Sequence, residues 1–147
     1  MKLLFFAVTK HQYRYFGNLS KNLPYRSSLS FFPSLKLSLQ GRKLLKEIDT
    51  QAILATKYKE IEVKYSNSLH KAFYKKLLQF QAPLVLMSIY HALTVHKPDY
   101  LVVWNGKKFH QEIAVEVAKV MGIQTIFFEN GVLPNTTTMD FRGVNAT

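Results

Sequence analysis

Two carboxylates near the end of the sequence could act together on one substrate. Glu129 follows the apolar run "IQTIFF", and Asp140 comes eleven residues later in a threonine-rich stretch that we expect to be a loop. A carboxylate at the mouth of a buried strand can handle a proton or cap a neighbouring helix. A second carboxylate, kept ionised by nearby hydroxyl groups, can face positive charge as it develops on a sugar carbon. We therefore predict Asp140 and Glu129 as catalytic residues, with Asp140 charged and Glu129 handling the proton.

A second polar group, "NGKK", follows the apolar run "YLVVW". Asn105 and Gly106 suit the positive φ of a strand-to-helix turn, which is a purely structural explanation. Lys107 and Lys108 at the start of a helix would also suit a phosphate or a carboxylate. The spacing matches neither a P-loop nor the dinucleotide fingerprint. Both explanations, a turn and an anion site, stay open.

The elements that position these residues form a repeating α/β pattern. Three apolar runs of strand length occur, at 2–8, 100–104 and 123–128. An amphipathic helix over 108–121, with Gly122 as its stop, separates the last two runs. Strands apolar on both faces, joined by such a helix, predict a Rossmann-like open parallel sheet with flanking helices. Ligands bind such sheets beyond the carboxyl ends of the strands, where Thr9-Lys10-His11 also falls.

The remaining segments carry less distinctive patterns. Residues 11–34 are rich in Tyr, Ser, Asn and Pro, and we expect mostly loop. Residues 35–80 predict a long basic helical region, and Pro83 is expected to open a second helix that ends before Pro98. The apolar stripe of the basic region steps at three or four residues and is expected to pack in the core. Its members are Leu54, Tyr58, Ile61, Tyr65, Leu69, Ala72, Phe73, Leu77 and Phe80.

Length and composition limit the classes of protein. A chain of 147 residues suits one domain over 1–147, and the absence of cysteine excludes disulfides and thiolate metal sites. We predict no metal site. The opening run "LLFFAV" is short for a signal peptide and lacks a cleavage site, so a buried strand is the better interpretation. No run reaches the ~18 apolar residues of a membrane span.

The positive charge is confined to the first half of the sequence. Residues 1–80 contain fifteen Lys and Arg against four Asp and Glu, a net charge of +11, whereas residues 81–147 contain five of each. Such a surface attracts the phosphates of nucleic acid, anionic lipid or a nucleotide, or it is only a solvated lysine-rich face. No nucleic-acid-binding motif is present, so no specific nucleic-acid partner is expected. One functional hypothesis is therefore a non-catalytic basic module that binds an anionic membrane surface or nucleic acid.

The segment from Trp104 to Ala146 supports a different hypothesis. It reads "WNGKKFHQEIAVEVAKVMGIQTIFFENGVLPNTTTMDFRGVNA" and resembles the bacterial capsule polysaccharide biosynthesis protein family. Members of that family are similar to the transferases that add 3-deoxy-manno-octulosonic acid (Kdo) from a CMP-sugar donor. The positions that match are Glu129, Gly131, Pro134, Asp140, Gly143 and Asn145. The chain has Phe141 where family members usually have proline after the aspartate.

The resemblance implies a glycosyltransferase of two Rossmann-like halves (GT-B-like), of which this chain would be the amino-terminal portion. It implies CMP-Kdo as donor, with no other cofactor, and a lipid or glycan as acceptor. It also implies a cytoplasmic location, peripheral at the inner membrane. We expect the 147-residue chain alone to lack transferase activity, because the family continues into a donor-binding half. The expected substrate-binding residues are Asn105, Gly106, Lys107, Lys108, His110, Asn130, Gly131, Asn135 and Asn145.

Overall fold

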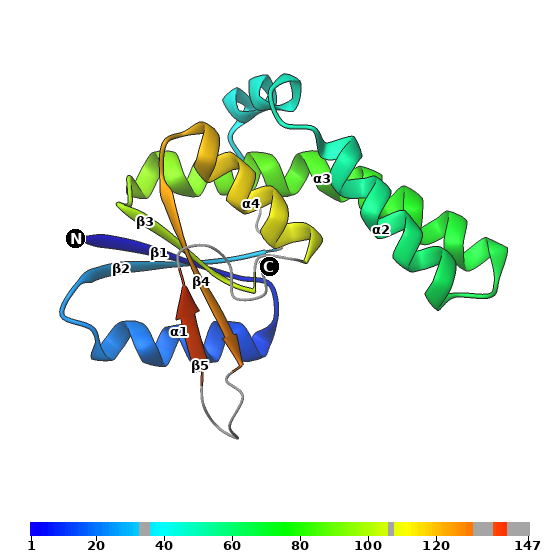
Figure 1. Cartoon of the computed structure of the whole chain (residues 1–147). Coiled ribbons are helices and arrows are strands. Elements are labelled where there is room, and N and C mark those ends of the chain that lie inside the picture. Colours follow the sequence, from blue (N-terminus) through cyan, green and yellow to red (C-terminus); the bar gives the residue numbers. More distant parts are fainter. Residues whose placement is uncertain (33–35, 106–107, 131–136, 141–147) are drawn as a thin grey trace.

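The computed structural model describes residues 1–32, 36–105, 108–130 and 137–140. A five-stranded sheet lies at its centre, in the order β2-β1-β3-β4-β5 (Figure 1). The first four of these are parallel, and β5 pairs antiparallel with β4. The strands are β1 (Lys2–Ala7), β2 (Arg26–Phe31), β3 (Tyr100–Trp104), β4 (Gln124–Asn130) and β5 (Thr137–Asp140). The predicted Rossmann-like α/β fold is therefore confirmed.

Helices cover both faces of the sheet. Helix α1 lies on one face, and α3 and α4 lie on the other (Figure 1). Their bounds are α1 (Lys10–Asn22), α3 (Ser68–His96) and α4 (Phe109–Val120); the 3₁₀ helix η1 (Leu39–Lys46) packs on α3, and α2 (Thr50–Lys64) contacts both α3 and α4. Alternate residues of β1 serve the two faces: Leu4 and Phe6 join the core under α3 and α4, while Phe5 joins Phe16 of α1. Burial on both faces explains why the parallel strands are continuous apolar runs.

The carboxyl-terminal βαβ unit agrees closely with the sequence pattern. Strands β3 and β4 are parallel neighbours, and α4 lies between them in the chain. Gly122 has a φ of +74°, and its N–H donates to the carbonyl of Lys119 while that of Ile123 donates to Ala118. These two bonds form a Schellman motif, in which glycine avoids the steric penalty of the left-handed conformation. The predicted stop at Gly122 is confirmed.

The expectation of a loop over 11–34 was wrong. The segment forms most of α1 and all of β2. The Thr9 side chain accepts a hydrogen bond from the Gln12 N–H at 3.2 Å and so caps α1. The helix buries Gln12 and Phe16. Because Gln12 is polar, the buried face of α1 does not show apolar residues at helical spacing. Because β2 is rich in serine, it does not show the apolar pattern of a strand.

Helix α3 is also longer than the sequence suggested. Pro83 does not open it but lies inside a continuous helix of 29 residues. Proline removes one backbone hydrogen bond from a helix interior. Burial of Val85, Leu86 and Ile89, each 0% exposed, outweighs this loss. The predicted end before Pro98 is confirmed, since the helix ends at His96.

By length and composition alone, helix α3 is long and apolar enough to cross a membrane. We expected no segment of this kind from the sequence. Half of its most apolar window is buried inside the protein. The carboxyl half of α3 packs against the sheet, which is typical of a core helix.

The long basic region divides into separate helices. Asp49 caps α2 by accepting a hydrogen bond from the Ala52 N–H at 3.0 Å. Asn67 caps α3 by accepting one from the Leu69 N–H at 2.9 Å. These two caps explain why the expected helical region over 35–80 is interrupted.

Residues 50–81, which comprise α2, the turn and the amino-terminal half of α3, form a helical hairpin that extends away from the sheet (Figure 1). We call this hairpin the arm. Leu54 and Ile61 are buried, as expected of the apolar stripe. Leu69, Ala72, Phe73 and Phe80 are exposed, so the core assignment was wrong for them. Their part of α3 lies beyond the sheet, where only α2 is available to cover it.

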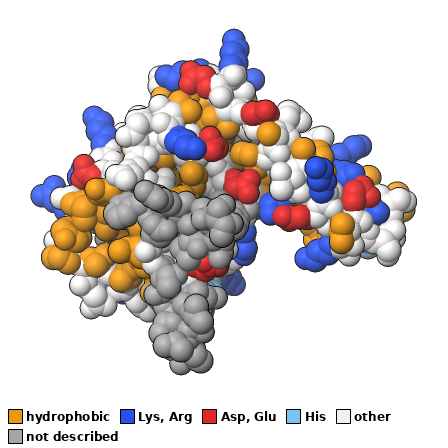
Figure 2. Space-filling view, in the orientation of Figure 1, with side chains coloured by type: hydrophobic (Ala, Val, Ile, Leu, Met, Phe, Trp, Pro, Cys, Tyr) orange, Lys and Arg blue, Asp and Glu red, His pale blue; other side chains and the backbone are white. Residues whose placement is uncertain are grey.

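The α1 face of the sheet is only partly covered. An apolar groove of about 420 Å³ runs beside α1, where Tyr100, Val102 and Ile126 of the sheet contribute to its floor. Met139 of β5 is 59% exposed at its border. Hydrophobic side chains gather on the left of the molecule in Figure 2.

Candidate functional site

The carboxyl ends of β1 and β3 form the edge of the sheet that we call the crevice, after the place where open α/β sheets bind ligands. The chain runs from β1 to its neighbour β2 and then returns to the other side of β1 as β3. This reversal makes the carboxyl ends of β1 and β3 the topological switch point of the sheet. Helix α1 begins directly after β1, and α4 begins shortly after β3. Both helices therefore present their amino termini, with free N–H groups, at this edge.

A buried pair of glutamines joins the two helices. The Gln12 side-chain oxygen accepts a hydrogen bond from the Val8 N–H at 2.9 Å and from the Gln111 Nε2 at 3.2 Å. Gln12 is 3% exposed and Gln111 is 0% exposed. The bond ties the start of α1 to the start of α4, so it fixes both helix termini at the crevice. The Gln111 Oε1 has no hydrogen-bond partner among the described residues.

Asn105 supplies a second acceptor of the same kind. Its φ of +67° confirms the predicted positive-φ turn after β3. Its N–H donates to the carbonyl of Phe128, which continues the β3–β4 ladder by one step. The Asn105 Oδ1 is buried and finds no partner in the part of the chain that the structure describes. Buried polar atoms are normally hydrogen-bonded, and an ordered water is the usual donor to an oxygen of this kind.

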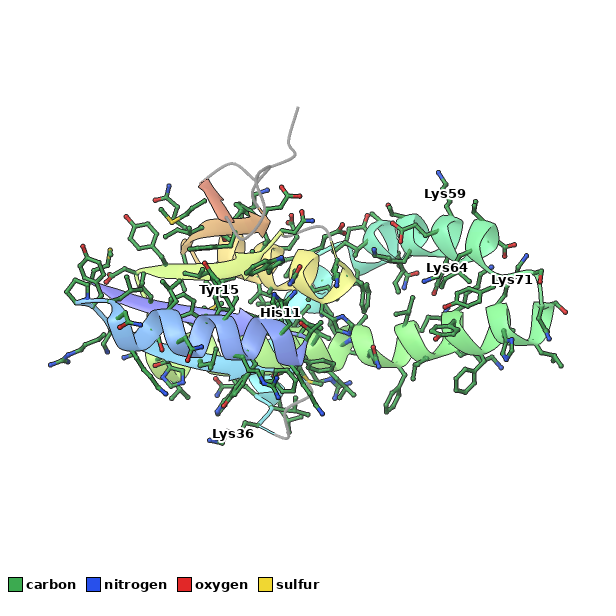
Figure 3. The ribbon with its side chains drawn as sticks, turned by 90° about the horizontal axis from the view of Figure 1, so that it is seen from below. His11, Tyr15, Lys36, Lys59, Lys64 and Lys71 are labelled. Atoms are coloured by element: carbon green, nitrogen blue, oxygen red, sulfur yellow. The ribbon has the colours of Figure 1, made fainter. Side chains whose placement is uncertain are left out.

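Aromatic residues form one side of this edge. The Trp104 ring, at the end of β3, meets the rings of His11 and Tyr15 edge-on at centroid distances of 5.8 Å and 5.2 Å. Figure 3 shows His11 and Tyr15 along α1, next to the sheet. His11 belongs to the Thr9-Lys10-His11 segment, which the sequence placed at a strand end. An aromatic floor with neighbouring amides can pack against the apolar face of a sugar ring or a base.

The two predicted carboxylates lie on paired strands. Glu129 is half-buried near the end of β4, next to Phe128, whose carbonyl binds Asn105. Asp140 lies in β5 rather than in the expected loop, because its backbone pairs antiparallel with β4. Glu129 is opposite Thr138, so Asp140 is its diagonal neighbour, two residues further along β5. Diagonal positions of an antiparallel pair are roughly 7–8 Å apart. The register thus brings the two positions close together, while their catalytic roles stay a prediction.

His110 lies on the side of the crevice that faces α3. Its Nε2 is 3.1 Å from the Gln81 Oε1, and its ring packs at 5.2 Å from that of Phe32. Burial, with smaller contributions from the positive charges of Lys57 and Lys108, lowers the pKa of His110 to about 4. The imidazole is therefore neutral at neutral pH, and its Nε2–H can donate to Gln81.

The other predicted substrate-binding residues are placed as follows. Lys108 is exposed at the N-cap position of α4, where it provides a positive charge beside the helix terminus. Asn130 is the last residue of β4. Gly106, Lys107, Gly131, Asn135 and Asn145 lie outside the described residues. No group of three or more His, Asp or Glu side chains within the described ranges could hold a metal ion.

The sequence reasoning missed Gln12 and Gln111. Gln12 stood in a segment interpreted as loop, and Gln111 was assigned to a helix without a role. Each glutamine is the third residue of the helix that follows its strand, and this shared position is the pattern that could have identified them.

The strand order and the flanking helices define the class of this protein as a Rossmann-like α/β protein, with polar and aromatic side chains at its switch point. No family model matches the chain. The chain is similar to protein FixF of Sinorhizobium fredii (strain NBRC 101917 / NGR234), with 31% identity over 84 residues. This match covers 56% of the chain and 20% of FixF. The chain therefore spans about a fifth of the length of this curated relative.

Proposed function

We propose that the chain is the Rossmann-like amino-terminal part of a glycosyltransferase in capsule polysaccharide biosynthesis. In this proposal the donor is a CMP-sugar of the Kdo type, the acceptor is a lipid or glycan, and the protein works in the cytoplasm at the inner membrane. The supporting observation is the register of β4 and β5, which brings Glu129 and Asp140 to diagonal positions. The buried amide oxygens of Asn105 and Gln111, which have no partner among the described residues, lie at the same edge of the sheet.

The surroundings of the two oxygens favour an acidic sugar over a neutral one. Amide oxygens accept hydrogen bonds from hydroxyl groups and repel a bare anion. The amino termini of α1 and α4 and the exposed Lys108, in contrast, attract negative charge. A sugar acid or a sugar phosphate carries both kinds of group. Trp104, which is only 9% exposed, would pack against its less polar face.

The carboxylates supply the proposed chemistry. Asp140 would face the positive charge that develops on the transferred sugar, and Glu129 would handle the acceptor's proton or orient the site. Their diagonal register is consistent with two groups that act on one bond from neighbouring positions. Asn105 next to Glu129 would hold a sugar hydroxyl near the reacting centre.

Binding can be tested by NMR of the side-chain amide groups. We expect CMP-Kdo, or Kdo supplied as a simple glycoside, to shift the NH₂ resonances of Asn105 and Gln111. The variant Gln111→Met keeps the volume and removes the acceptor together with the bond to Gln12, and it should weaken binding by about tenfold, one hydrogen bond's contribution. Gln12→Met is the matched control, because it breaks the same bond and keeps the Gln111 Oε1. Titrations of CMP and of Kdo separately show which part of the donor is held.

A shift of the Asn105 resonance by CMP-Kdo or the Kdo glycoside that Gln111→Met removes and Gln12→Met keeps supports the proposal. If neither ligand perturbs Asn105 or Gln111 at millimolar concentration, the assignment of the crevice to a sugar is wrong. Equal weakening by both variants would also contradict it, because a general loss of packing would then explain the effect.

A further inference from the structure

The arm carries an apolar face that nothing in the described structure covers. Leu69, Phe73 and Phe80 are 78%, 65% and 68% exposed. Their spacing of four and seven residues places them on one side of α3. Large apolar side chains exposed in such a row are typical of a surface that binds a partner. Figure 2 shows hydrophobic side chains beside charged ones on the arm, at the right of the molecule.

The opposite side of α3 already holds α2. The rings of Tyr65 and Tyr74 stack at a centroid distance of 5.0 Å across the turn. The Lys75 Nζ lies 5.6 Å from the centre of the Tyr58 ring. The hairpin is therefore closed by contacts that do not use Leu69, Phe73 or Phe80, and its apolar row is available.

The carboxylates of the arm are engaged by its own lysines. Glu60 pairs with Lys57 at 3.0 Å, and Glu62 binds both Lys71 and Lys75. The hydrogen bonds from these two lysines lower the pKa of Glu62 to about 2. These exposed pairs contribute little to stability. They do mean that both carboxylates of the arm are already paired with lysines of the arm.

The arm has a surplus of positive charge. Residues 50–81 contain six lysines and two glutamates, a net charge of +4. The lysines outside the carboxylate pairs are Lys59, Lys64 and Lys76. Figure 3 shows Lys59 on the outer side of α2, and Lys64 and Lys71 near the turn between the helices. Lys76 lies between Phe73 and Phe80 in the row, so positive charge borders the apolar face.

We propose that the arm docks on the surface of an anionic lipid bilayer. Leu69, Phe73 and Phe80 enter the boundary between headgroups and acyl chains, and the surplus lysines bind the headgroup phosphates. The lysine stems can lie along the apolar face while their charged ends reach the phosphates. This combination of exposed phenylalanine and lysine on one helix fits a bilayer, which offers apolar depth and negative charge within a few ångströms.

The two other partners fit less well. A second copy would place one +4 arm against another, and like charges oppose that contact. Double-stranded nucleic acid would satisfy the lysines, but phosphate contacts give the exposed phenylalanines no apolar environment. Both partners are therefore outcomes that the experiment must separate from the bilayer.

Vesicle sedimentation tests the proposal with the 147-residue chain. We expect binding to vesicles of phosphatidylcholine mixed with phosphatidylglycerol and weaker binding to phosphatidylcholine alone. The double variant Phe73→Ser/Phe80→Ser should weaken partitioning by about tenfold or more, because each ring loses its apolar environment. Leu69→Ser should weaken it as well. Leu39→Ser is the matched control: Leu39 is 74% exposed on η1, away from the arm, and its loss should change nothing.

A pair of charge variants tests the electrostatic part. Lys76→Gln on the arm and Lys21→Gln on α1 remove the same charge from exposed positions. Only Lys76→Gln should weaken binding. Raising salt from about 0.1 M to about 1 M shortens the Debye length from about 10 Å to about 3 Å, so binding should fall without disappearing. Residual binding at high salt should depend on Phe73 and Phe80.

Three results would overturn the proposal. Unchanged binding of Phe73→Ser/Phe80→Ser would show that charge alone acts. Binding of double-stranded DNA that is as tight as vesicle binding would favour nucleic acid. A dimer in analytical ultracentrifugation that these serines dissociate would favour a second copy. Because the replaced side chains are exposed, circular dichroism should show unchanged folding, and a blue shift of Phe73→Trp emission on vesicles, beyond that of Trp104 alone, would report insertion directly.

Discussion

At the scale of single residues, His110 connects burial to pH dependence. Its folded-state pKa of about 4 lies below the unfolded value of about 6.5, so the unfolded chain binds its proton more tightly. The contribution of the neutral imidazole to stability is fully present above pH 6.5. It is lost as the pH falls from about 6.5 towards 4.

We predict that His110→Phe flattens the loss of stability between pH 6.5 and pH 4. Phenylalanine keeps the ring contact with Phe32 and cannot be protonated. Thermal unfolding at several pH values measures the effect, and the matched control is His70→Phe, because His70 is exposed on the arm. An unchanged pH profile in His110→Phe would contradict the assignment.

Two carboxylates act in other ways and do not obscure that comparison. Glu62, with its pKa lowered to about 2, loses its contribution between pH 4.5 and 2, below most of the window of His110. Burial raises the pKa of Glu112, so acidification favours the folded state there. Both groups are present in wild type and variant, so the difference between the two isolates His110.

The proposed roles of Asp140 and Glu129 lead to unequal effects in the two-domain transferase that we propose. Asp140→Asn keeps the shape and removes the charge that faces the sugar, so turnover should fall by several orders of magnitude. Glu129→Gln should be less severe, nearer ~10²–10⁴-fold. Steady-state transfer from CMP-Kdo, with circular dichroism as the folding control, measures both. Near-normal activity of Asp140→Asn would make Asp140 a structural residue of β5.

At the scale of elements, η1 depends on one close approach to α3. A Cβ on Gly41 would lie 3.1 Å from the Tyr90 Cβ and 3.3 Å from the Met87 Cα, so a side chain there would force η1 and α3 apart by a few tenths of an ångström. Gly41→Val should therefore lower the free energy of unfolding by about 1–3 kcal/mol. Gly17→Val is the matched control, since its Cβ would meet only the Leu29 Cδ2 at 3.8 Å.

Chemical unfolding with denaturant measures both glycine variants. The Gly17→Val value should stay within about 1 kcal/mol of wild type, because valine and glycine differ little in helix propensity. Equal stability of Gly41→Val and wild type would mean that η1 can move away from α3 without loss, and that the packing there is not required.

The sequence predicted the βαβ unit well because its physics is local. Local sequence is enough to predict this unit: apolar runs predict β3 and β4, and Gly122 predicts the end of α4. Segments stabilised by tertiary contacts were not predictable in this way. The buried Gln12 accepts a hydrogen bond from Gln111, which is far away in the chain. Pro83 lies inside a helix whose following residues are held in the core.

The candidate site likewise has features that local sequence predicts and features that depend on the tertiary structure. The turn at Asn105 was predictable because positive φ is a local demand of the chain. The convergence of two helix termini was not, because it depends on the strand order, which no single segment encodes. The exposure of Phe73 and Phe80 was missed for a related reason: a helical stripe predicts an apolar face and does not say what covers it.

At the scale of the whole molecule, the net charge is distributed unequally along the chain. The net charge of +11 belongs to residues 1–80, which include the arm, whereas the segment with β3, α4 and β4 is balanced. The crevice draws on both parts of the chain, because α1 supplies His11 and Gln12 while α4 supplies Gln111. The arm also contacts the crevice, since Gln81 lies against His110, so we do not expect changes in the two regions to be fully additive.

The direction of α3 has a mechanical consequence. Its last residue, His96, receives a hydrogen bond from Lys2 at the amino end of β1, while Gln81 contacts His110 near the carboxyl edge. Residues 68–80 therefore extend about 20 Å past the edge that holds the crevice. A surface that binds residues 68–80 would therefore fix the height and the tilt of the crevice relative to that surface. Molecules confined to that surface would then meet the crevice by diffusion in two dimensions, at a raised effective concentration.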